Sequence, residues 1–141
     1  MFCKMSVGYG ATAVLAVQDD KTIIYKYAPY NLNLSEFRNG EATFDGLITI
    51  CTEAMIEPEI HEKLKRTPGK RKRLVVKRIR REVDYFELLR SGKIMVESSQ
   101  YCWESIGTDQ NIGKMAMLII YHIFNYYQDN GALSARVSLN Y

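Results

Sequence analysis

The chain lacks any long apolar run, since nothing in its 141 residues approaches the ~18 consecutive apolar side chains that a membrane-spanning helix needs. It is also poor in cysteine. The three that it has, Cys3, Cys51 and Cys102, are far apart and odd in number, which argues against a disulfide framework and for a reducing compartment. We therefore expect free thiols, no membrane partner and a cytoplasmic location.

The sequence also lacks motifs that are typical of a particular reaction or cofactor. The stretch around Gly107 and Gly113 is not a phosphate-binding loop, because five residues rather than four separate the two glycines, and Met115 stands where a Ser or Thr is required. No nucleophile, base and orienting group occur in a recognisable pattern. Four acids follow one another without the spacing of a metal site, namely Glu53, Glu57, Glu59 and Glu62. The sequence therefore indicates no metal and no cofactor, and it favours a non-catalytic domain.

What the chain does contain is a strongly uneven distribution of charge. Between Lys63 and Arg81 there are eleven cations and no acid, which leaves eight cations against sixteen acids, a charge of −8, in the remainder. The net charge of +3 conceals this division. Because charge asymmetry bears on partners and solubility rather than on the fold, this basic segment (residues 63–81) is the strongest functional signal in the sequence.

One helical pattern dominates the second half of the chain. From residue 108 to residue 131, apolar side chains recur at steps of three and four, which is the period of an α-helix. We expect Ile119 and Ile123 to be buried and Gly131 to take the left-handed conformation that ends a helix. A narrow polar stripe should face water, and it comprises Lys114, Tyr121, Asn125 and Gln128, with His122 and Asp129 beside it.

Shorter patterns predict the first strands. Residues 11–17 and 21–28 are rich in Val, Ile and Tyr on either side of Asp19-Asp20, which predicts a β-hairpin. With a two-residue turn between the strands, Val14 would face Tyr25. Residues 47–51, 93–103 and 136–141 are expected to be further strands.

Two short helices are predicted between these strands. Pro58 suits the first position of a helix that runs to about Lys65. Asp84 and Glu87 have the spacing of a capping box, so a second helix should begin there and end at residues 91–92. Residues 74–79 fit either a strand or an extension of that second helix.

This order of elements predicts a single compact α+β domain over residues 1–141. We expect a mostly antiparallel or mixed sheet that starts with a β-hairpin. It should pack against one long buried C-terminal helix and two short helices.

The basic segment leads to a prediction of function. Its cations could neutralise several phosphates, with affinity from counterion release and without any reading of sequence, and the planar fork of arginine suits bidentate phosphate contact. We therefore predict a binding domain that engages a polyanion, with the phosphate backbone of DNA or RNA as the favoured target. The residues assigned to it are Lys70, Arg71, Arg73, Lys77, Arg78 and Arg80.

Other interpretations stay open. The basic segment could be a solvated loop and edge strand whose cations discourage edge pairing. The domain could bind a protein partner or a second copy of itself, as an adaptor or inhibitor, with tyrosines as anchors. Tyr25 and Tyr27 share one strand face, where they could stack on bases or pack under the long helix. A small nucleotide-like anion could bind at the start of the long helix, near Thr108.

Overall fold

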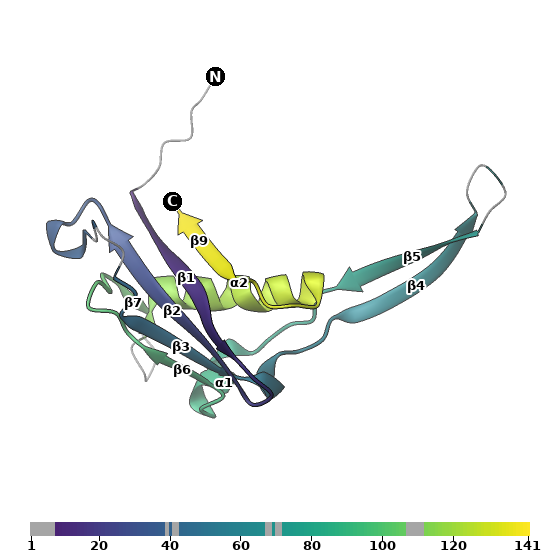
Figure 1. The fold of residues 1–141 in the computed structure, drawn as a ribbon, viewed down its shortest axis with the longest axis horizontal. Helices are drawn as coiled ribbons and strands as arrows, with labels where there is room; N and C mark the ends of the chain where they lie inside the picture. The colour runs from purple at the N-terminus through teal and green to yellow at the C-terminus, as the bar shows by residue number, and fades with distance from the viewer. Residues whose placement is uncertain (1–7, 39, 41–42, 67–68, 70–71, 107–111) are drawn as a thin grey trace, which may run out of the picture.

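The computed structural model describes residues 8–38, 40, 43–66, 69, 72–106 and 112–141. Its centre is a five-stranded sheet in the order β6-β3-β2-β1-β9, with one long helix, α2, across one face (Figure 1). The strands of this sheet are β1 (Tyr9–Gln18), β2 (Thr22–Asn31), β3 (Gly46–Cys51), β6 (Ile94–Glu97) and β9 (Arg136–Asn140). All neighbouring pairs are antiparallel, and the predicted α+β class is confirmed. We call this sheet, with α1 (Tyr85–Arg90) and α2 (Lys114–Asn130), the body.

The core lies between α2 and the face of the sheet that the helix covers. Tyr25 on β2 pairs with Ile48 on β3, and both side chains are fully buried. Ala13 on β1 is buried as well, so the strand offers only a small side chain there. From the helix, Ile119 and Ile123 are buried completely, as their helical spacing predicts.

The start of the long helix differs from the prediction, which placed it at residue 108. The helix begins at Lys114, because Ile112 and Gly113 form a short strand, β8 (Ile112–Gly113), that pairs with β7 (Ser105–Ile106). A Cβ at Gly113 would lie 2.8 Å from Cys102 Sγ, so the glycine permits this close approach. Thr108 lies outside the described residues.

The end of the helix agrees with the prediction. Gly131 has a φ of 73°, and its N–H donates to the carbonyl oxygen of Tyr127. Gln128, which was expected on the polar stripe, is instead buried at 2% exposure. Its side-chain amide forms hydrogen bonds with the backbone of Arg81.

The pairing of β1 and β2 is shifted by one residue from the predicted register. Val14 lies opposite Lys26, and Tyr25 lies opposite Leu15. The shift arises because the turn is longer than two residues and because β1 contains a bulge between Leu15 and Val17. The Asp19 carboxylate accepts the backbone N–H groups of residues 21 and 22 and so holds this turn.

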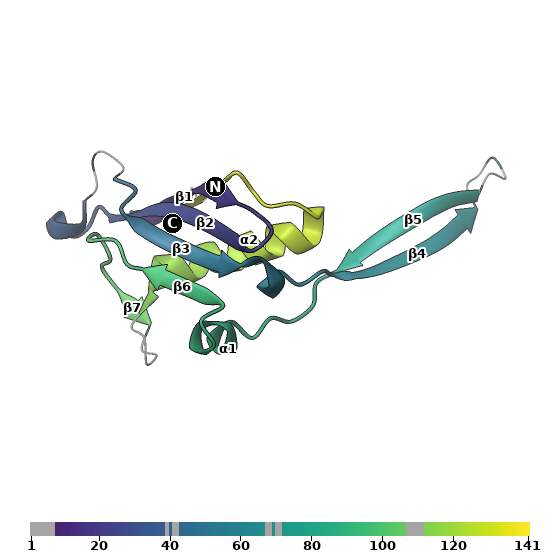
Figure 2. The same ribbon diagram turned by 60° about the horizontal axis from the view of Figure 1, so that its bottom comes forward.

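The basic segment forms most of a two-stranded antiparallel ribbon that projects from the body (Figures 1 and 2). Its strands are β4 (Glu59–Arg66) and β5 (Lys72–Ile79), and we call this ribbon the arm. The helix predicted from Pro58 to Lys65 is therefore wrong. The four-residue step from Ile60 to Leu64 fits a helix and also a strand face, and pairing with β5 decides for the strand.

Short elements complete the chain. The 3-10 turns are η1 (Ser35–Phe37) and η2 (Thr52–Ala54), and η2 leads from the sheet toward the arm. Asp84 precedes α1, and its side chain accepts the N–H of Glu87 at 3.1 Å. The described helices are all too short or too polar to cross a membrane.

Candidate nucleic-acid interface

The register of the arm separates its side chains onto two faces, since alternate residues of a strand point to opposite sides and paired residues share a side. One face, which we call the cationic face, carries His61, Lys63, Arg73 and Lys77. The other, the aliphatic face, carries Ile60, Leu64, Leu74 and Val76. The aliphatic face also bears Arg66 and Lys72 at its outer end.

The cations of the cationic face are available to an external partner. Lys63, Arg73 and Lys77 are exposed. Within the described part of the chain, none of these three has a carboxylate at ion-pair distance. His61 lies 3.5 Å from the Glu59 carboxylate near the root of the arm.

The outer end of the arm concentrates like charge. Arg66 lies directly opposite Lys72, and both side chains are exposed. Like charges in directly opposite positions destabilise an antiparallel pair. An anion bound between these two side chains would relieve their repulsion.

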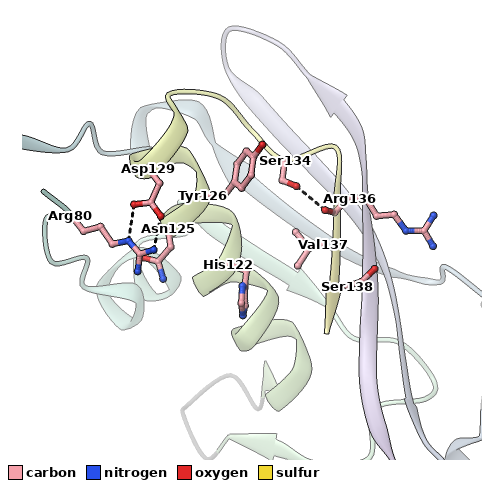
Figure 3. Close-up of a pocket in the computed structure, with 9 residues that line it drawn as sticks. All are labelled: Arg80, His122, Asn125, Tyr126, Asp129, Ser134, Arg136, Val137 and Ser138. Atoms are coloured by element: carbon pink, nitrogen blue, oxygen red, sulfur yellow. Dashed lines mark hydrogen bonds and ion pairs between the residues drawn. The ribbon is translucent and has the colours of Figure 1, made fainter. Parts of the chain in front are cut away.

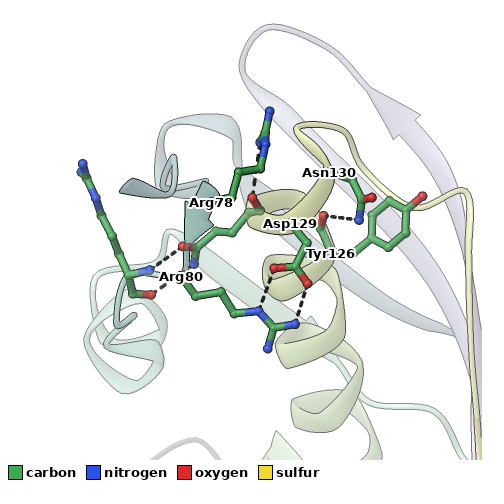
Figure 4. Close-up of polar contacts among 7 residues, drawn as sticks. Arg78, Arg80, Tyr126, Asp129 and Asn130 are labelled. Carbon is green, nitrogen blue, oxygen red and sulfur yellow. Dashed lines mark hydrogen bonds and ion pairs between the residues drawn. The ribbon is translucent and has the colours of Figure 1, made fainter. Parts of the chain in front are cut away.

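Two of the predicted site residues serve a different purpose, because they fasten the arm to the last turn of α2 (Figure 4). Arg78 Nη1 donates to the carbonyl oxygen of Gln128 at 3.3 Å, at the helix end where a cation is favourable. Arg80 forms a fork with Asp129, in which Nε donates to Oδ1 at 2.8 Å and Nη2 to Oδ2 at 2.5 Å. This fork is the bidentate contact that the sequence suggested for phosphate.

Gln128 completes the attachment at the root of the arm. Its Oε1 accepts the N–H of Arg81 at 2.6 Å, and its Nε2 donates to the carbonyl oxygen of the same residue at 3.2 Å. A buried amide that pairs with both backbone groups of one residue fixes that residue firmly. The Arg80 guanidinium stabilises the attachment less than this buried amide does. Its hydrogen bonds and charge lower the pKa of Asp129.

The structure therefore divides the six predicted phosphate-binding residues into three groups. Arg73 and Lys77 lie on the cationic face, and phosphate contact by them stays a prediction. Arg78 and Arg80 already have partners in α2. Lys70 and Arg71 lie outside the described residues, as does the anion site predicted at Thr108. Sequence reasoning missed Lys63 as a member of the interface, although it belongs to the same basic segment.

A pocket of about 410 Å³ lies beside this attachment, between α2 and the edge strand β9 (Figure 3). The residues that line it are Arg80, His122, Asn125, Tyr126, Asp129, Ser134, Arg136, Val137 and Ser138. Four of them lie on α2, and three of these, His122, Asn125 and Asp129, belong to the predicted polar stripe or lie beside it, so part of that stripe borders the pocket. The pocket was not predicted, because the position of β9 beside the helix is not encoded locally.

The chemistry of the pocket is polar and largely balanced. The Arg80–Asp129 pair lies along its wall, and the Arg136 side chain points away from α2 (Figure 3). The described residues contain no cluster of three or more His, Cys, Asp or Glu side chains that could hold a metal ion. The pocket thus offers hydrogen bonds without a strong preference for the charge of a ligand.

The two tyrosines for which stacking on bases and packing under the long helix were both open are buried. Tyr25 and Tyr27 are at most 1% exposed and pack beneath α2. The Tyr25 hydroxyl donates to the carbonyl oxygen of Ser134 at 2.5 Å, and burial raises its pKa to about 12. The Tyr27 hydroxyl accepts the N–H of Ser99. The interpretation of these two rings as exposed base-stacking groups is therefore wrong.

Comparison of the chain with protein-family models, with curated protein sequences and with solved structures finds no match.

Proposed function

We propose that this protein is a non-catalytic domain that binds the phosphate backbone of nucleic acid through the cationic face of its arm. The observation that carries the proposal is the exposure of Lys63, Arg73 and Lys77 on one side of a projecting ribbon, without carboxylates in the described part of the chain to neutralise them. Arg66 and Lys72 extend the positive surface to the outer end of the arm.

Binding of this kind has a simple physical basis. Each cation that contacts a phosphate releases condensed counterions, and the entropy of their release supplies the affinity. Contacts to the backbone position a protein without reading the bases, so affinity should be similar for many sequences. The free thiols of Cys51 and Cys102 support a reducing compartment, and we place the protein in the cytoplasm on that basis.

A variant with Lys63, Arg73 and Lys77 changed to Gln tests the proposal. These side chains are exposed, so the variant should unfold at the same temperature as the wild type. Its affinity for a fluorescent oligonucleotide should fall. The slope of log affinity against log salt should shrink by about 2.7, because each of the three cations that neutralises a duplex phosphate accounts for about 0.9 of that slope.

A matched control removes three cations from the body instead. Lys26, Lys93 and Arg136 are exposed, and their change to Gln alters the net charge by the same amount. This control should retain both the affinity and the salt slope. Equal losses in the two variants would mean that overall charge, and not the arm, governs binding, and the proposal would be abandoned.

A second function, association with a protein, is favoured by the aliphatic face. Ile60, Leu64, Leu74 and Val76 are exposed by 51%, 62%, 53% and 51% on one side of the arm. Association through these side chains would persist in high salt, whereas phosphate binding would not. Sedimentation in high salt tests it, since a complex or dimer should form with the wild type and be lost when Leu64 and Leu74 are changed to Ser.

A further inference from the structure

We infer that the nucleic acid is double-stranded DNA and that the arm lies in its major groove. This inference rests on the proposed function and names the substrate of the same surface. It follows from the width of the arm, from the residue types that it lacks and from its separation from the acidic body.

The width of the arm matches one groove of the double helix. Two strands lie about 4.8 Å apart, and the side chains on the two faces give the ribbon a thickness of about 10 Å. The major groove of B-form DNA is about 12 Å wide and admits a two-stranded ribbon, whereas the minor groove is about 6 Å wide. In double-stranded RNA the major groove is too narrow for side chains to enter. The arm therefore fits DNA better than it fits double-stranded RNA.

The composition of the arm argues against single strands. Proteins that hold single-stranded nucleic acid place aromatic side chains beneath successive bases. From residue 59 to residue 79 the chain contains no Phe, Tyr or Trp. The exposed aromatic side chains, such as Phe86 and Tyr126, lie in the body and not in the arm. Without such groups in the arm, its cations gain most from a duplex, where phosphates of two strands flank one groove.

The length of the arm agrees with a contact of several base pairs. Each strand has eight residues, which span about 27 Å at about 3.4 Å per residue. Duplex DNA carries one phosphate per strand for about every 3.4 Å of its axis, so the arm covers about eight base pairs. With the cationic face toward the groove, Lys63, Arg73 and Lys77 can each reach a flanking phosphate.

Projection of the arm also separates the DNA from the acids of the body. The chain outside the basic segment has a charge of −8, which would repel a duplex lying against it. Charges separated by more than a Debye length, about 8 Å at physiological salt, are largely screened from each other. An arm several times longer than this distance screens the duplex from most acids of the body, and the two acids of the arm itself, Glu59 and Glu62, lie in the half of β4 nearer the root.

The cationic face offers little for sequence recognition. No Asn or Gln occurs between residues 59 and 79, so the bidentate pairing of an amide with adenine is absent there. Arg73 is the only arginine among the four residues of the cationic face and could favour a guanine. We therefore expect binding to duplex DNA with a weak preference for sequence.

The experiment compares four forms of one sequence of about 20 base pairs in low salt, with the full chain and fluorescence anisotropy. The plain DNA duplex should bind best, and the single DNA strand should bind about tenfold more weakly because no aromatic side chain stacks on it. The RNA duplex should be weaker to a similar degree. A DNA duplex whose cytosines carry glucosylated hydroxymethyl groups, which fill the major groove, should bind no better than the Lys63, Arg73 and Lys77 variant binds plain duplex.

A minor-groove ligand completes the test. Netropsin bound to an A·T-rich duplex fills the minor groove and should leave the affinity unchanged. Loss of binding with netropsin, or unchanged binding to the glucosylated duplex, would overturn the assignment to the major groove.

The proposed function and the choice of substrate can be disproved separately. If the single strand or the RNA duplex binds as tightly as the DNA duplex, and the triple variant still loses binding, the substrate class is wrong and the proposed function survives. If no form binds to the wild type at low salt, the proposed function itself is wrong.

Discussion

The body and the arm are stabilised in different ways. In the body, α2 covers one face of the sheet, and side chains such as Tyr25 and Ile123 are completely buried. In the arm, two strands pair with each other, and large side chains such as Leu64 remain more than half exposed. A two-stranded ribbon without a packed face is marginally stable in water. Packing therefore restricts which residue types the body can contain. The exposed positions of the arm are not restricted in this way, so their residue types depend on what the arm binds.

The largest expected difference between the two regions is in the free energy of unfolding after the same kind of substitution in each. Ile123→Asp buries an unpaired charge in the core and should lower the free energy of unfolding by about 3 to 5 kcal/mol. Leu64→Asp places the same charge on an exposed face and should change it by about 0.5 kcal/mol or less. Denaturant unfolding followed by circular dichroism measures both, with Asn125→Ala as a neutral control on α2. Similar losses for the two Asp variants would remove the distinction between body and arm.

The junction between the regions should show an intermediate effect. Gln128→Ala leaves both backbone groups of Arg81 without their partner in a half-buried place and should cost about 1 to 3 kcal/mol. Arg80→Gln removes an exposed ion pair and should cost about 1 kcal/mol or less. Unfolding measurements give both values, and amide exchange at Arg81 should accelerate in the first variant. If the arginine change proved the more harmful, the ion pair and not the buried amide would fix the root of the arm.

The ionisation of tyrosine at alkaline pH should affect the body and not the arm, because the arm has no tyrosine. Burial raises the pKa of Tyr25 from 10 to about 12, so the unfolded chain loses this proton at a lower pH than the folded chain. Stability from the protonated hydroxyl is therefore complete below pH 10 and is lost as the pH rises toward 12.

The size of this loss should be on the order of 1 kcal/mol. Melting temperatures recorded between about pH 9 and pH 12 should fall less steeply for Tyr25→Phe than for the wild type. Parallel curves for the two proteins would show that the hydroxyl titrates as an ordinary exposed phenol.

The smallest effect should be confined to the arm. Arg66→Glu places an acid directly opposite Lys72 and should stabilise the ribbon locally by about 0.2 to 1 kcal/mol. Amide exchange in β4 and β5 should slow, while global unfolding of the body should be unchanged. Faster exchange in the variant would mean that like charge is not the feature that weakens the arm.

Sequence patterns were informative where burial is periodic. Ile119 and Ile123 follow the helical period of α2 because one stripe of that helix is covered by the sheet. Gly131 was identified as its end because the left-handed conformation there favours glycine. At these positions the local sequence pattern predicts the same structure that packing in the folded protein requires.

The arm shows why the remainder could not be predicted. A ribbon exposed on both faces has no buried side to impose a clear alternation, and Pro58 before a four-residue apolar step suggested a helix. The cations of the basic segment were recognised, but the attachment of Arg78 and Arg80 to α2 was not predicted. Gln128 and Asp129, which bind Arg81 and Arg80, lie 47 and 49 residues away in the chain. The pairing shift in the first two strands likewise depends on a bulge that no turn motif indicates.

The pairing of Glu59 with Ile79 at the root means that the chain leaves the body and returns to it at one place. In topological terms the arm is an insertion, because a short turn could join these two positions without altering the path of any strand in the sheet. It can therefore be excised, lengthened or transferred to another scaffold as a unit. A body without the arm would carry the acidic charge of the remaining chain. A foreign domain that received the arm would acquire a projecting, positively charged surface.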